Sequence, residues 1–162
     1  MPRYYRKPAR TQIETSIQIR VARYIRSHYP DVLFHSDTGS GIKLTAAQGY
    51  INKALQGGVR GYPDMIICKP STRFDWHTTK FYHPDENKNT ATKHGLFIEL
   101  KKEKTRLKKK DGSWASDHIE EQADILRKLR AEGYAAEFAV GYAEAIFLID
   151  EYFNNNKREE VF

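Results

Sequence analysis

The chain has little with which to cross-link or anchor itself. It holds one cysteine, Cys68, in 162 residues, so a disulfide framework is excluded. No apolar run approaches the length of a membrane-spanning helix. Residues 1–10 are basic and lack the apolar centre of a signal peptide. These absences predict a soluble protein of a reducing compartment, in which Cys68 is a small buried hydrophobe.

Apolar periodicity predicts eight elements in the order helix, strand, helix, strand, strand, helix, strand, helix. The expected helices are residues 12–27, 45–56, 117–132 and 143–153, and the expected strands are residues 32–36, 65–68, 96–101 and 135–140. Strands that alternate with helices indicate an α/β layer fold around a mixed sheet. The strands at residues 65–68 and 96–101 are expected to be antiparallel neighbours.

Local signals predict how several elements begin and end. Thr11 is an expected N-cap, and Asp117 with Glu120 resembles a capping box. Asp111-Gly112 predicts a hairpin turn. The polar tail from Asn154 is expected to fray. This divides the chain into a basic arm (1–10), one domain (11–153) and a tail (154–162).

Residues 69–95 form a polar stretch that is long for a connection within one domain. It is either a functional flap or an ordered hairpin. Its aromatic residues Trp76, Phe81 and Tyr82 could stack on unpaired bases. They could equally form a small satellite core.

Charged residues border two of the apolar runs. Asp64 precedes one strand, and Glu99 and Lys101 end another. Side chains alternate along a strand, so Glu99 and Lys101 share a face while Leu100 points into the core. If the two strands are neighbours, Asp64, Glu99 and Lys101 converge. Two carboxylates suit a hard divalent cation, and an adjacent lysine can act on water or phosphate.

The metal-ligand set in this pattern consists of oxygen atoms. The six histidines show no zinc-like spacing with Cys68 or with each other. Oxygen ligands favour magnesium or manganese.

Positive charge is in excess and clustered. The net charge is +6, with a sequence pI near 9.3. The larger cluster comprises Lys101, Lys102, Lys104, Arg106, Lys108, Lys109 and Lys110. Such a run can be solubilising surface or a phosphate-binding surface. Its position directly after the Glu99 strand favours nucleic acid.

Three motifs resemble those of the PD-(D/E)xK nucleases and, more narrowly, the VRR-NUC family. They are Gly61-Tyr62-Pro63-Asp64, Phe97-Ile98-Glu99-Leu100-Lys101, and Glu121-Gln122 on a helix. The resemblance covers residues 11–153. It implies a restriction-endonuclease-like fold, with three layers around a mixed sheet. The polar stretch 69–95 and the basic segment 102–118 are longer than the compact family pattern.

The resemblance also implies roles for individual residues. Asp64, Glu99 and the backbone carbonyl of Leu100 would bind Mg²⁺ (or Mn²⁺). Lys101 would orient or deprotonate the attacking water, or stabilise charge in the transition state. Gln122 would donate a hydrogen bond. Glu14 would be a further ligand, although Thr11-x-x-Glu14 also fits a capping box.

The activity implied is magnesium-dependent endonucleolytic hydrolysis of DNA, at Holliday junctions or other branched DNA, by a homodimer. Arg60 and the basic segment would bind the DNA backbone. Such small proteins serve repair and recombination in the cytoplasm of bacterial or phage-infected cells. Two alternatives stay open: a catalytically silent nucleic-acid-binding module of the same fold, and a monomeric nickase or flap nuclease.

Overall fold

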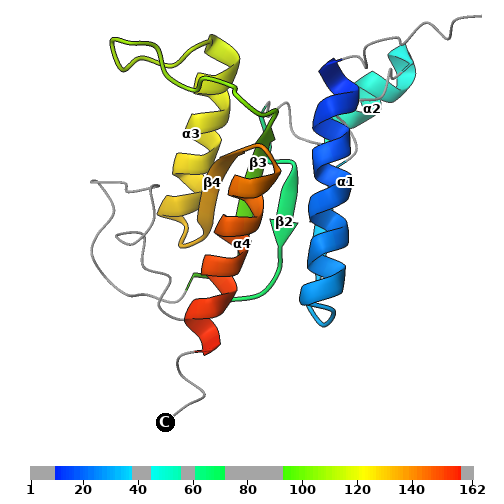
Figure 1. Cartoon of the computed structure of the whole chain (residues 1–162). Helices are drawn as coiled ribbons and strands as arrows, with labels where there is room; N and C mark the ends of the chain where they lie inside the picture. The colour runs from blue at the N-terminus through cyan, green and yellow to red at the C-terminus, as the bar shows by residue number, and fades with distance from the viewer. Residues whose placement is uncertain (1–9, 38–44, 56–60, 72–92, 158–162) are drawn as a thin grey trace, which may run out of the picture.

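The computed structural model describes residues 10–37, 45–55, 61–71 and 93–157 of the chain (Figure 1). The elements follow the expected order. They are α1 (Arg10–His28), β1 (Phe34–Ser36), α2 (Ala46–Leu55), β2 (Met65–Ile67), β3 (Leu96–Lys101), α3 (Asp117–Ala131), β4 (Ala135–Val140) and α4 (Tyr142–Lys157). Within these described ranges, every helix is too short or too polar to cross a bilayer.

The four strands form one mixed sheet in the order β1-β2-β3-β4. β2 pairs antiparallel with both β1 and β3, whereas β3 and β4 are parallel. At the centre of the sheet, Ile98 lies between Met65 and Glu137. The mixed sheet and the antiparallel β2–β3 pair are thus confirmed.

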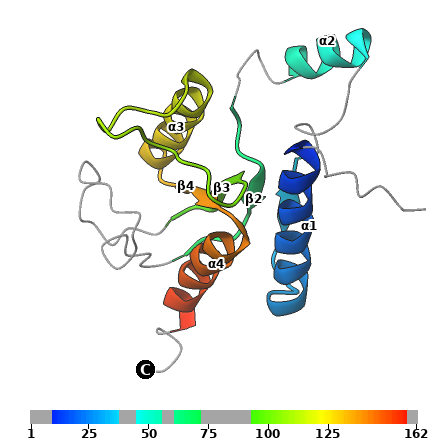
Figure 2. The same ribbon diagram turned by 45° about the horizontal axis from the view of Figure 1, so that its top comes forward.

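Helices cover both faces of the sheet. α1 and α4 pack on one face, where Ile25, Leu148 and Ile98 belong to the larger core cluster. α3 packs on the other face, where Leu126 meets Phe97 in the second cluster. Figure 2 shows α3 on one side of the sheet and α1 with α4 on the other. The result is the three-layer α/β fold that the sequence predicts.

Strand β3 follows the expected alternation closely. Leu96, Ile98 and Leu100 face α1 and α4, and Phe97 faces α3. All residues of the strand except Lys101 are buried. The predicted inward orientation of Leu100 is confirmed.

Several predicted element ends were wrong. The N-cap of α3 is Ser116, whose Oγ accepts a hydrogen bond from Ile119 N at 3.3 Å. Asp117 therefore lies in the first turn of α3, where its negative charge interacts favourably with the positive end of the helix dipole. α1 begins at Arg10, so Thr11 is inside the helix and not its cap. α4 extends past Asn154 to Lys157.

The predicted burial of Cys68 was also wrong, since its side chain is exposed. β2 ends at Ile67, and the two-residue period turns Cys68 away from the face that buries Met65 and Ile67. Its N–H still donates to Leu33 O at 2.9 Å. The apolar run in the sequence, residues 65–68, is thus one residue longer than strand β2.

Only the ends of the long polar stretch 69–95 are described. Ser71 and Lys93 form an antiparallel bridge, with N–O distances of 2.9 and 2.8 Å. Ser71 Oγ also donates to Tyr152 O at 2.9 Å, which ties the bridge to α4. Trp76, Phe81 and Tyr82 lie outside the described residues.

Candidate active site

The pairing of β2 with β3 ends at Met65, and the residues before it help to form a pocket. Gly61 has φ +79°, a conformation that favours glycine. A Cβ at Gly61 would lie 2.9 Å from Gln122 Cγ, so the chain passes close to α3 here. β2 begins only at Met65, opposite Ile98. Asp64 therefore sits where residues 99–101 of β3 have lost their β2 neighbour.

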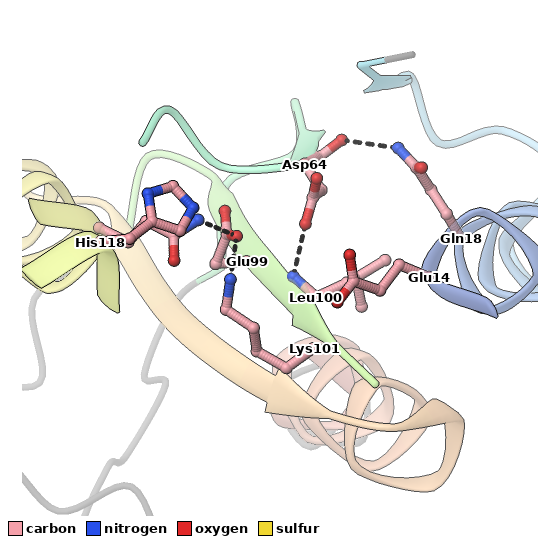
Figure 3. Close-up of a pocket in the computed structure, with 8 residues that line it drawn as sticks. Glu14, Gln18, Asp64, Glu99, Leu100, Lys101 and His118 are labelled. Atoms are coloured by element: carbon pink, nitrogen blue, oxygen red, sulfur yellow. Dashed lines mark hydrogen bonds and ion pairs between the residues drawn. The ribbon is translucent and has the colours of Figure 1, made fainter. Parts of the chain in front are cut away.

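Asp64 is held against the part of β3 that does not pair with β2. Its Oδ2 accepts a hydrogen bond from Leu100 N at 2.8 Å (Figure 3). Burial raises the pKa of the Asp64 carboxyl to about 6; the Leu100 hydrogen bond and the Lys101 charge oppose this, while Glu14 and Asp37 add to it. The carboxylate is thus costly to charge unless a cation lies nearby.

Glu99 is the most deeply buried carboxylate of the pocket, with 3% of the residue exposed. Its Oε1 accepts from Lys101 Nζ at 2.8 Å and from Gln122 Nε2. Its Oε2 is buried without a hydrogen-bond partner among the described residues. Burial, followed by the charge of Asp64, raises the pKa of Glu99 to about 8, against the lowering effect of Lys101. In the described part of the chain, Lys101 therefore pairs with one oxygen of Glu99 and leaves the other without a partner.

These side chains line one pocket of about 70 Å³. Its walls come from α1, the residue before β2, β3 and α3, and they consist of Glu14, Gln18, Asp64, Glu99, Leu100, Lys101, His118 and Gln122. All six residues that the sequence assigned to catalysis or metal binding are therefore brought together. Their chemical roles stay predictions.

The donor set fits a hard divalent cation. Asp64 and Glu99 supply carboxylates, and Glu99 Oε2 is a buried acceptor without a partner in the described structure. Lys101 O accepts from Gly141 N at 2.7 Å on the β4 side. The backbone groups of Leu100 therefore face the Asp64 side, as its N–H does. Its carbonyl is available there as a third oxygen ligand.

Glu14 lies on α1, lines the pocket and raises the pKa of both carboxyls. Within the described ranges, no three His, Cys, Asp or Glu side chains cluster tightly enough to form a metal site by themselves. The ligand role of Glu14 thus stays a prediction. The capping-box alternative loses its basis, because α1 begins before Thr11.

Sequence reasoning missed two lining residues. Gln18 is buried and its Nε2 donates to Ser36 Oγ at 2.8 Å and to the carbonyls of Asp37 and Asp64. His118 is in the first turn of α3, with its exposed ring 3.9 Å from Glu121. Each lies four residues from a predicted site residue, Gln18 after Glu14 and His118 before Gln122. That helical spacing, which places side chains on one face, was the available signal.

The basic segment after β3 folds into a hairpin around Asp111-Gly112, as predicted. Lys109 N donates to Ser113 O at 2.8 Å, and Lys108 bridges to Trp114. Leu107 and Trp114 pack against the α3 side of the core. The lysines and Arg106 stay at least partly exposed: Lys102, Lys104, Arg106, Lys108, Lys109 and Lys110. Arg60 lies outside the described residues.

Comparison with solved structures finds proteins of similar fold. The chain is similar to a protein described as "VRR_NUC domain protein", with a TM-score of 0.57 over 93% of each chain and 20% sequence identity. It shares that protein's fold. No family model matches the chain. Neither does any curated protein.

Proposed function

We propose that this protein is a metal-dependent endodeoxyribonuclease. One observation carries the proposal: Asp64, Glu99, Leu100 and Lys101 meet in a single pocket in which Glu99 Oε2 is buried without a described partner. A site built only for stability would satisfy that oxygen or replace the carboxylate. The fold shared with a VRR_NUC domain protein supports the same class of activity.

Asp64, Glu99 and the Leu100 carbonyl would hold Mg²⁺ or Mn²⁺, with Glu14 as a candidate fourth ligand. When bound, the ion would supply Lewis-acid activation of the scissile phosphate and of water. Gln122 fixes Glu99 through its hydrogen bond, and Leu100 N fixes Asp64. The chain therefore orients both carboxylates before substrate arrives.

Lys101 supplies a positive charge among the residues that line the pocket. Its Nζ donates to Glu99 Oε1 at 2.8 Å, and both side chains are largely buried. We therefore assign to it the orientation of the attacking water and the stabilisation of charge on the transition-state phosphate. The water oxygen forms a bond to phosphorus as the bond to the leaving oxygen breaks. One water proton passes to solvent, and the leaving oxygen gains one from solvent.

The basic hairpin provides the DNA-binding surface. It is anchored by Leu107 and Trp114, and it follows directly from β3, whose Lys101 lines the pocket. Phosphate contacts of this kind bind without reading sequence. Selection would then depend on DNA shape, and we extend the proposal to branched DNA cut by a homodimer.

The test is cleavage of labelled four-way junction, flap and linear duplex DNA in Mg²⁺, Mn²⁺ or EDTA. We expect metal-dependent cleavage of branched DNA that Glu99→Gln abolishes. Glu132→Gln, an exposed change at the far end of α3, is the matched control. Binding without cleavage by the parent protein in every metal would overturn the catalytic proposal and favour the silent binding module. Unpaired single cuts would favour a monomeric nickase.

A further inference from the structure

Gln18 is a polar side chain on the part of α1 that packs into the core. Only 9% of the residue is exposed, and Ile17 and Val21 on the same helix belong to the larger core cluster. An apolar side chain of similar length would suit these surroundings without the cost of burying an amide. The hydrogen bonds of the amide must therefore account for its place here.

The amide nitrogen of Gln18 joins the ends of two neighbouring strands. It donates to Ser36 Oγ at 2.8 Å and to Asp37 O, at the end of β1, and at 3.4 Å to Asp64 O, directly before β2. Figure 3 shows it directed at Asp64 from α1. Carbonyl oxygens only accept hydrogen bonds, so the nitrogen of the amide must face them. One neutral group thus holds two segments that are far apart in the sequence.

Asp64 is fixed at both its backbone and its side chain. Asp37 N donates to Asp64 O at 2.8 Å, and Gln18 in turn holds the carbonyl of Asp37. On the side chain, Leu100 N donates to Asp64 Oδ2 at 2.8 Å. The bond from Leu100 fixes one carboxylate oxygen, whereas the bonds from Asp37 and Gln18 fix the backbone from which the side chain projects.

We propose that Gln18 is a positioning residue for the proposed metal site. It holds the backbone of Asp64 so that this carboxylate stays in the pocket with Glu99 before a divalent cation binds. The inference rests on the proposed function. Hydrogen-bond partners behind the ligands themselves set how tightly a metal is bound. Gln18 can act in this way without adding charge to a pocket that is already lined by three carboxylates and one lysine.

The competing explanation is a tether that only stabilises the fold, and Ser36 separates the two. The bond from Gln18 to Ser36 Oγ links α1 to β1 and does not involve Asp64. If the tether were the whole role of Gln18, Ser36→Ala would weaken metal binding as much as loss of the amide does. If Gln18 acts through Asp37 and Asp64, Ser36→Ala leaves metal binding unchanged.

The test is Mn²⁺ binding to the DNA-free protein, followed through the electron paramagnetic resonance signal of the free ion. Gln18→Met keeps a side chain of similar length and removes both donors. We expect it to bind Mn²⁺ about tenfold more weakly than the parent, whereas Ser36→Ala should bind as the parent does. Cleavage by Gln18→Met should recover as the Mn²⁺ concentration is raised, because the ligands themselves are unchanged. Urea denaturation would verify that each variant is folded, and Gln18→Leu is a second variant without the amide.

A folded Gln18→Met that binds Mn²⁺ as tightly as the parent would overturn the inference and leave the proposed function standing. Equal weakening by Ser36→Ala would also overturn it, in favour of the tether. Failure of both Gln18→Met and Gln18→Leu to fold would have the same meaning. A parent protein that neither binds Mn²⁺ nor cleaves DNA would refute the proposed function itself.

Discussion

The two halves of β3 belong to one strand but have opposite chemistry. Residues 96–98 pair with β2 on one side and β4 on the other. Residues 99–101 keep β4 but lie beyond the start of β2, and there Glu99 and Lys101 line the pocket. The first half is suited to stability and the second to chemistry. The difference arises where one neighbouring strand ends, which opens space for polar groups inside a buried layer.

The largest expected effect is a loss of cleavage when a carboxylate beside the second half of β3 is replaced. Asp64→Asn removes the charge that faces residues 99–101, while the side-chain oxygen can still accept from Leu100 N. We expect cleavage to fall to about a thousandth or less, because a hard cation would lose an anionic ligand. Cleavage rates together with thermal unfolding would check this. Equal activity in Asp64→Asn and the parent would exclude Asp64 as a ligand.

A substitution in the first half should act on stability instead. Ile98 is fully buried between Met65 and Glu137. Ile98→Ala should lower the free energy of unfolding by about 2–5 kcal/mol. Urea denaturation measures the loss. Cleavage per folded molecule should stay near the parent level, and a loss of activity without a loss of stability would contradict the division between the halves.

The carboxyls at the second half of β3 should also make the stability of the protein depend on pH. The pKa of Glu99 rises from its ordinary 4.5 to about 8, and that of Asp64 rises from 3.8 to about 6. The folded protein therefore binds these protons more tightly than the unfolded chain. When protonated, the two carboxyls stabilise the folded protein, and this stabilisation is fully present below about pH 4. It is lost as the pH rises through their folded-state pKa values of about 6 and 8.

Denaturation of the metal-free protein between pH 5 and 8 would measure this decline. Glu99→Gln should flatten it, because glutamine does not titrate. Added Mg²⁺ should raise the melting temperature more at pH 8 than at pH 5, since protons compete with the metal for both carboxylates. A magnesium effect that is independent of pH would argue against binding at these groups.

The smallest expected effect concerns the turn that opens the pocket. Gly61→Ala would place a methyl group 2.9 Å from Gln122 Cγ in a backbone conformation with φ +79°. We expect a loss of about 1 kcal/mol or more in unfolding free energy. Cleavage should fall as well, because Gln122 holds Glu99. Gly112→Ala is the control: its φ is also positive, but its Cβ would meet nothing within 4 Å. A similar loss of cleavage in the two variants would show that Gln122 is not displaced.

Much of the fold and part of the site could be predicted from the chain. The run Leu96-Phe97-Ile98 and the alternation after it placed Leu100 in the core and grouped Glu99 with Lys101. Other assignments failed because local patterns do not show which surface is covered. Cys68 continued an apolar run but lies past the end of β2. The helix 45–56 was foreseen, but nothing in its pattern showed that α2 would lack a packing partner in the described structure.

The sequence by itself determined the order of the elements and the alternation along β3, because both depend on residues close together in the chain. It also determined the net positive charge. Only the tertiary structure decided that Gln18 and His118 join the pocket, and that Glu99 is buried with one oxygen that has no hydrogen-bond partner among the described residues. These features depend on how far β2 extends along β3 and on which helices cover the gap. Both are set by packing between distant segments, which no local spacing specifies.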